Sequence, residues 1–179
     1  MTMTVASVNV PRPAGAPGVL RLVPAAGPVD VGMAGFGDRA DQHPHALYAY
    51  PTAHLPFWRT VRAQARAAAP DAPIPPGSFD EHLALDGVLE SQLWVGDLLR
   101  FPDCTLVVSL PRLPDARFNE TLGFEHAARM VAQSRWCGFW LAVRMPGRIA
   151  AGDAFELLPG PRATGLVELF RARIKGKTW

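Results

Sequence analysis

The residues from Val108 to Asn119 read VSLPRLPDARFN, and they join the end of an apolar strand to a charged, proline-rich turn. The first part continues the apolar run CTLVVSL, whose β-branched residues are typical of a buried strand. Pro111 and Pro114 cannot continue a central strand, because proline lacks the N–H that a sheet hydrogen bond needs. Arg112 and Asp115 therefore leave the sheet together, which predicts a charged turn at the mouth of the core.

Proline and glycine occur 18 and 16 times in 179 residues, a frequency that favours many short strands over a few long helices. Alanine and arginine predict the clearest helix, over Phe57 to Ala69, and further helices are expected over residues 125–134 and 166–179. The predicted strands lie within residues 4–10, 18–23, 27–33, 90–101, 104–110, 138–145 and 146–158. This pattern predicts a mainly β fold, a barrel with a few helices packed on it.

One globular domain spanning residues 1–179, with a basic tail over about 171–179, is the simplest organisation, because 49% hydrophobic residues supply one substantial core. The formal net charge is only +2 and the arginines are spread along the chain, which speaks against nucleic acid as a partner. No run approaches the ~18 apolar residues of a membrane span, and the first residues lack the apolar core of a signal peptide. We therefore expect a cytoplasmic protein without a membrane partner.

Residues that carry metal or covalent chemistry are sparse. Cys104 and Cys137 form neither a disulfide framework nor a zinc-ligand pattern, and both are predicted to be small buried apolar residues. His43 and His45 flank a proline and make an incomplete ligand set, so no metal site is predicted. The only two lysines stand near the C-terminus, which excludes a Schiff-base lysine in the body of the fold.

Five short segments follow one another in a distinctive order: GPVDVGMAGFGDRAD, ALYAYPTAHLPFW, FDEHLALDGVLESQLWVGD, VVSLPRLPDARFN and CGFWLAVRMPGRIAAGDAFEL. From about Val5 to about Leu169 this order resembles the MOSC family, named after the C-terminal part of molybdenum-cofactor sulfurase, and in particular its stand-alone bacterial branch. The resemblance implies a β-barrel of mixed strands with a basic pocket. In active relatives that pocket holds the pterin molybdenum cofactor, a cysteine ligands molybdenum or carries sulfur, and some members reduce N-hydroxylated compounds.

The proline-rich turn departs from the family pattern at its most reactive position. The pattern is a strand ending in Ser-Gln-Pro-Arg, followed by Pro-Cys and a basic residue. Six residues of this chain match the pattern: Ser109, Pro111, Arg112, Pro114, Arg117 and Asn119. Asp115 takes the place of the cysteine. Because a carboxylate is harder than a thiolate and cannot carry persulfide sulfur, the usual molybdenum ligand is missing.

Other segments of the family pattern also differ. The His-Gly-Gly loop expected before ALYAYP is replaced by the shorter DRADQHPH. The Gly-Glu-Asn-Leu site reads DEHL, so Glu81 is retained and His82 replaces the asparagine. Arg21 stands where relatives usually have a lysine. The resemblance therefore implies a retained barrel with a rewritten pocket.

Three residues form the predicted catalytic set: Asp115, His82 and Glu81. An aspartate beside two guanidiniums stays ionised and can take a proton, and a neutral imidazole can serve as acid or base near pH 7. The predicted anion-binding set consists of Arg112, Arg117, Arg21, Ser109 and Asn119. The alternative for both sets is structural: a solvated ion pair in the turn, a surface histidine and plain surface charge.

Three functions remain open. The first is a molybdenum-independent enzyme that uses acid–base chemistry, such as a cyclisation, elimination or isomerisation, on a small polar or anionic metabolite in biosynthesis; it needs no cofactor and is the preferred interpretation. The second is a reductase of N-hydroxylated compounds, or a sulfur carrier, that binds the molybdenum cofactor. The third is a non-catalytic binding protein. The expected partner is a small molecule, and a homodimer is compatible with the sequence.

Overall fold

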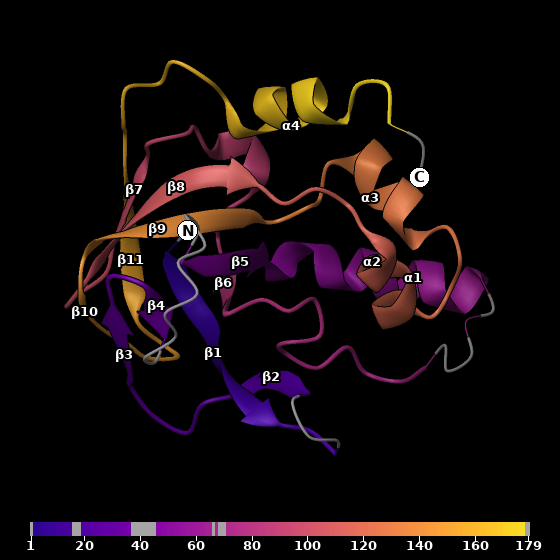
Figure 1. The fold of residues 1–179 in the computed structure, drawn as a ribbon, viewed down its shortest axis with the longest axis horizontal. Coiled ribbons are helices and arrows are strands. Elements are labelled where there is room, and N and C mark those ends of the chain that lie inside the picture. The colour runs from indigo at the N-terminus through magenta and orange to yellow at the C-terminus, as the bar shows by residue number, and fades with distance from the viewer. Residues whose placement is uncertain (1, 16–18, 37–45, 66, 68–70, 178–179) are drawn as a thin grey trace.

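A closed barrel forms the centre of the computed structural model, which describes residues 2–15, 19–36, 46–65, 67 and 71–177 (Figure 1). Seven strands close it in the order β11, β7, β8, β9, β5, β6 and β1, and β1 pairs again with β11. The strands are β1 (Met3–Pro13), β2 (Leu20–Pro24), β3 (Val29–Gly32), β4 (Gly35–Phe36), β5 (Leu47–Pro51), β6 (Leu83–Asp86), β7 (Leu98–Arg100), β8 (Thr105–Pro111), β9 (Phe139–Met145), β10 (Gly147–Ile149) and β11 (Ala154–Leu158). The barrel predicted from the sequence is confirmed.

The barrel is mixed because β5 and β6 run parallel while its other neighbouring strands are antiparallel. Strand β2 extends from β1 beyond the closed ring, and β3, β4 and β10 form a separate small sheet. The helices are α1 (Leu55–Gln64), α2 (Ala116–Leu122), α3 (Ala127–Ser134) and α4 (Leu166–Ile174), with the short 3-10 turns η1 (Thr52–His54) and η2 (Glu90–Gln92). Figure 1 shows α1, α2 and α3 gathered at the side of the barrel away from the small sheet.

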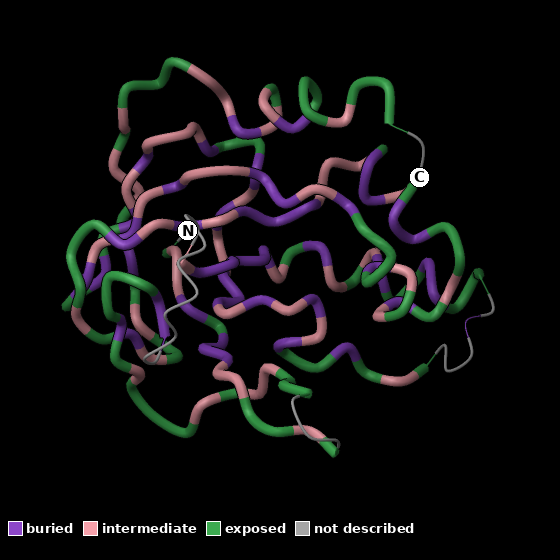
Figure 2. Tube along the Cα trace, in the orientation of Figure 1, coloured by how far each residue is buried: buried purple, intermediate pink, exposed green. Residues whose placement is uncertain are grey.

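Apolar side chains form two layers of core. The first fills the barrel and includes Leu47, Leu106 and Phe139. The second lies between the barrel wall and the helices and includes Tyr48 and Phe118. All five residues of β5 are buried, because this strand faces the barrel interior on one side and the helices on the other (Figure 2).

Local structure differs from the prediction at several places, and two of the barrel strands, β5 and β6, lie outside the strands predicted from the sequence. Helix α1 begins at Leu55, two residues early, because Pro56 suits the first helical turn, and it ends at Gln64 instead of running to Ala69. Residues 90–92, predicted within a strand, form η2. The charged turn after β8 becomes helix α2 from Ala116 onward, because Asp115 is its N-cap and accepts a hydrogen bond from the Arg117 N–H. Within the described ranges, no helix is both long and apolar enough to cross a membrane.

Candidate functional site

A cleft of about 490 Å³ opens at the rim of the barrel, where the segment between β8 and α2 meets the loop before β6. Its lining comprises Pro11, Leu20, Arg21, Leu22, Asp80, His82, Arg112, Asp115, Arg117 and Trp140. The proline-rich turn and the DEHL segment, 30 residues apart in the sequence, therefore face one cavity. Arg21, His82, Arg112, Asp115 and Arg117 from the predicted sets lie together in it.

Arg112 is buried beneath the cleft and supports it. Its Nη1 donates to the Phe79 carbonyl oxygen, and its Nη2 donates to Asp115 at 3.2 Å. The guanidinium carbon lies 4.9 Å from the ring centroids of both Tyr48 and Phe118. A planar guanidinium that lies between two rings and donates hydrogen bonds along its edge has little freedom to move toward a ligand. Arg112 therefore fixes the position of the loop and of Asp115.

Asp80 is a cleft residue that sequence reasoning missed. Its Oδ2 accepts a hydrogen bond of 2.6 Å from Arg117 Nη1 and lies 3.7 Å from Arg112 Nη2. The backbone of Asp80 has φ 60, in the left-handed region that few residues other than glycine adopt. The sequence carries no local signal for this role, because the contacts join segments more than 30 residues apart.

Asp115 caps helix α2 and also exposes its carboxylate to the cleft. Oδ1 accepts a hydrogen bond of 3.0 Å from the Arg117 N–H at the start of α2, while Oδ2 forms an ion pair with Arg112. Its side chain is 47% exposed, so the carboxylate still faces the cleft. Asp115 therefore places an accessible carboxylate at the cleft.

The His82 ring has a defined tautomer. The Tyr48 backbone N–H donates to Nδ1 at 3.0 Å, and Phe36 contacts the ring edge to face at 5.8 Å. A nitrogen that accepts an N–H bond carries no proton, so the neutral ring carries its proton on Nε2. The ring of His82 lines the cleft.

Arg21 stands apart from the other arginines of the cleft. Among the described residues it makes none of the ion pairs that hold Arg112 and Arg117 to Asp80 and Asp115. Arg21, Leu20 and Asp80 also line an adjoining cavity of about 330 Å³, so Arg21 lies where the two cavities meet. The two acidic side chains balance Arg112 and Arg117, and Arg21 supplies the remaining positive charge.

Three predicted site residues do not join the cleft. The Glu81 carboxylate accepts hydrogen bonds from the backbone N–H groups of Gly77 and Phe79 and lines a different cavity. Ser109 Oγ donates to the Trp140 carbonyl oxygen at 2.9 Å. Asn119 Oδ1 accepts 2.8 Å from the Ala128 N–H at the start of α3. In each of these three residues, the polar group that makes these contacts stabilises the fold.

The donor set of the cleft does not fit a molybdenum cofactor held by a protein thiolate. Cys104 and Cys137 are the only cysteines, both are buried, and neither lines the cleft. Burial raises the pKa of Cys104 to about 12 and that of Cys137 well above its usual value, so both remain thiols. The His43–His45 segment lies outside the described residues.

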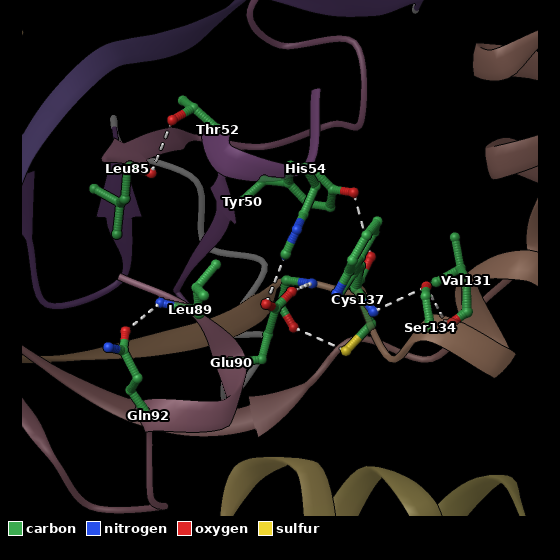
Figure 3. Close-up of polar contacts among 12 residues, drawn as sticks. Tyr50, Thr52, His54, Leu85, Leu89, Glu90, Gln92, Val131, Ser134 and Cys137 are labelled. Atoms are coloured by element: carbon green, nitrogen blue, oxygen red, sulfur yellow. Dashed lines mark hydrogen bonds and ion pairs between the residues drawn. The ribbon is translucent and has the colours of Figure 1, made fainter. Parts of the chain in front are cut away.

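A second buried polar cluster, shown in Figure 3, joins η1, η2 and the segment before β9. His54 Nε2 lies 2.7 Å from Glu90 Oε2, and Glu90 Oε1 accepts 2.8 Å from the Gly138 N–H. The His54 ring stacks on Trp136 at 4.6 Å, and Cys137 Sγ donates to the Gly138 carbonyl oxygen. Sequence reasoning placed Glu90 in a strand and missed this pair, which ties the turns to the barrel.

These features define a mixed-strand β-barrel protein with a charged cleft at its rim. A family model described as "MOSC domain" matches residues 36–156, and the chain belongs to this family. It is 29% identical over 113 residues to "Uncharacterized protein YflK" of Bacillus subtilis and 30% identical over 114 residues to "Protein YiiM" of Escherichia coli, in each case over 63% of this chain and 48% of the relative. The chain thus spans about half the length of the curated relatives it matches.

Solved structures show the same fold. The crystal structure of YiiM from Geobacillus stearothermophilus superposes with a TM-score of 0.77 and 24% identity, over 97% of this chain and 84% of the other. The crystal structure of YiiM from Escherichia coli has a TM-score of 0.72 and 22% identity, over 100% and 80%. At these identities the likeness establishes the barrel and leaves the chemistry to the residues of the cleft.

Proposed function

We propose that the cleft binds a small anionic metabolite and catalyses a proton transfer on it without molybdenum. The observation that carries the proposal is a single cavity lined by the Asp115 carboxylate, the His82 imidazole and the Arg21 guanidinium. Arg21 takes part in none of the ion pairs described above. An acid, a base and a charge that orients the ligand are what a proton-transfer enzyme needs within reach of one substrate.

Arg21 supplies the anchor for the ligand. The charges of Arg112 and Arg117 are already matched by carboxylates of the protein, whereas Arg21 is exposed at the edge of the cleft. A guanidinium binds carboxylate or phosphate through two parallel hydrogen bonds, which orients the ligand as well as attracting it. The ligand class is therefore a small molecule that carries a phosphate or a carboxylate.

The two titratable groups differ in what they can do. Asp115 presents an accessible carboxylate oxygen, which accepts a proton, while neutral His82 carries its proton on Nε2 and donates it. Removing a proton at one atom of the substrate and adding one at another gives an isomerisation; loss of a protonated leaving group gives an elimination, and attack by a group of the same molecule gives a cyclisation. The missing thiol favours this chemistry over a molybdenum reductase.

The test is a titration of the protein against a panel of phosphorylated and carboxylated metabolites, with Arg21→Ala compared with Arg173→Ala. Arg173 is an exposed arginine of α4 and serves as the matched control. Loss of one charged hydrogen bond is worth ~1.5–3 kcal/mol, so Arg21→Ala should weaken binding by on the order of tenfold or more. Equal affinities of the two variants for every ligand in the panel would refute the proposal. Binding without turnover of any ligand would leave a binding protein in place of an enzyme.

A further inference from the structure

The loop from Pro75 to Glu81 borders the cavity that adjoins the cleft, contributes Asp80 to the cleft itself, and is held at both sides. On the side of α2, Thr121 Oγ1 donates to the Ser78 carbonyl oxygen at 2.9 Å. On the side of β2, Gly77 has φ 86, and a Cβ at this position would lie 2.4 Å from the Leu22 carbonyl oxygen. The loop thus fits closely between the strand that carries Arg21 and the helix that follows Asp115.

Asp80, near the end of this loop, places a carboxylate beside two guanidiniums of the cleft. Its carboxylate pairs with Arg117 and lies within ion-pair distance of Arg112, and it lines both adjoining cavities. A left-handed backbone at a residue other than glycine costs energy unless its surroundings hold it there. A carboxylate held beside two guanidiniums is chemically equivalent to a bound carboxylate ligand.

Glu81 holds Asp80 in that conformation. Its side chain is buried. Oε1 accepts a hydrogen bond of 2.6 Å from the Gly77 N–H, and Oε2 accepts one of 2.9 Å from the Phe79 N–H. Both donors belong to the residues that lead into Asp80. These two hydrogen bonds fasten the loop to the buried Glu81 side chain.

We propose that Asp80 is an internal anion that competes with the ligand for Arg117 and Arg112, and that Glu81 is the positioning residue that keeps it there. The inference rests on the proposed anion-binding function and adds to it a determinant of affinity and specificity. A ligand gains access to these guanidiniums by displacing Asp80. A phosphate dianion, which carries more charge than the Asp80 carboxylate, is therefore selected over a monocarboxylate.

The charge state of Glu81 links this competition to pH. The charged and titratable groups around it are its chain neighbours Asp80 and His82, then Tyr48, and, across the cavity that Glu81 lines, Tyr50 and Arg59. Burial raises the pKa of Glu81 to about 7, although its backbone hydrogen bonds lower it. Because burial makes the charged form of Glu81 unfavourable, loss of its proton above that pH works against the buried position and loosens the loop, and Asp80 then competes less well. The part of the anion affinity that depends on Glu81 should therefore rise as pH rises through neutrality.

The experiment is a calorimetric titration with inorganic sulfate, a tetrahedral dianion whose charge is constant near neutral pH. Asp80→Asn removes the competing charge and keeps the backbone, because asparagine tolerates the left-handed region well. Glu120→Gln removes the same charge from an exposed position on α2 and is the matched control. We expect Asp80→Asn to bind sulfate about tenfold more tightly than the parent, a change of ~1.4 kcal/mol, with Glu120→Gln close to the parent.

Glu81→Gln separates positioning from direct competition. It leaves one of the two backbone N–H groups without its carboxylate acceptor, so it should raise sulfate affinity, abolish the rise that the parent shows from about pH 6 to about pH 8, and add nothing further in an Asp80→Asn background. Asp80→Asn alone decides the question if Glu81→Gln does not fold.

Equal sulfate affinity in Asp80→Asn and Glu120→Gln, or additive effects in the double variant, overturns the inference. If sulfate binding is lost in Arg21→Ala and unaffected by Asp80→Asn, only this inference fails. Absence of sulfate binding in both the parent and Asp80→Asn contradicts the inference and the proposed function together.

Discussion

Replacement of Arg112 by alanine should cost stability, because the guanidinium is enclosed by the fold. Its hydrogen bond to the Phe79 carbonyl oxygen is worth ~1.5–3 kcal/mol, since the donor is charged. Packing between the Tyr48 and Phe118 rings adds ~0.5–2 kcal/mol. The pairs with Asp80 and Asp115 add only ~0–1 kcal/mol, because both carboxylates are nearly half exposed. The total is about 2–6 kcal/mol.

Arg117→Ala is the matched control, because Arg117 pairs with the same Asp80 and its side chain is 65% exposed. It should lose no more than ~1 kcal/mol. In urea unfolding followed by circular dichroism, Arg112→Ala should therefore be less stable than Arg117→Ala by about 1–6 kcal/mol, and a difference of about 3 kcal/mol, near the middle of this range, would lower its melting temperature by roughly 6–12 °C. Equal stability of the two variants would show that Arg112 is a surface charge, and the geometry of the cleft would need another explanation.

Two more outcomes follow from the carboxyl groups of the site. The pKa of Glu81 is about 7 in the folded protein and near 4.5 in an unfolded chain, so its contribution to stability is complete below about pH 4.5 and is lost as pH rises through 7. Unfolding free energies measured across this range should fall with pH more steeply in the parent than in Glu81→Gln, and parallel curves would contradict the assignment. Asp115→Asn keeps the helix cap but removes the proton acceptor, so for any metabolite that the parent converts it should lower kcat and leave Kd within about twofold. An unchanged kcat would remove Asp115 from the mechanism.

The barrel could be predicted because its signals are local. Apolar runs such as those of β8 and β9 predict strands wherever they pair, and frequent glycine and proline set the turns. Closure of the ring depends on pairing of Met3 with Phe155, at opposite ends of the chain, which no local pattern specifies. The ordered family segments supplied that information.

The residues proposed for the site come partly from the same source. Arg112, Asp115 and His82 lie in two of the ordered segments, and the fold brings them to one cleft. Asp80 and the true contacts of Glu81 could not be predicted, because both depend on a loop conformation with a left-handed residue. Helix α2 had a readable signal: aspartate at the N-cap and Gly123 at the end, in the left-handed conformation, are typical helix boundaries. The neighbouring prolines led to a turn being predicted instead.

The central claim is that this MOSC barrel works on an anionic metabolite without molybdenum, and elemental analysis tests it most directly. The protein should be purified from a host that makes the molybdenum cofactor, and its molybdenum and pterin contents measured per chain, with a family member that retains the cysteine prepared in parallel. Because neither Cys104 nor Cys137 reaches the cleft, we predict molybdenum far below one atom per chain in this protein. Near-stoichiometric molybdenum together with a bound pterin would contradict the account and favour the reductase function.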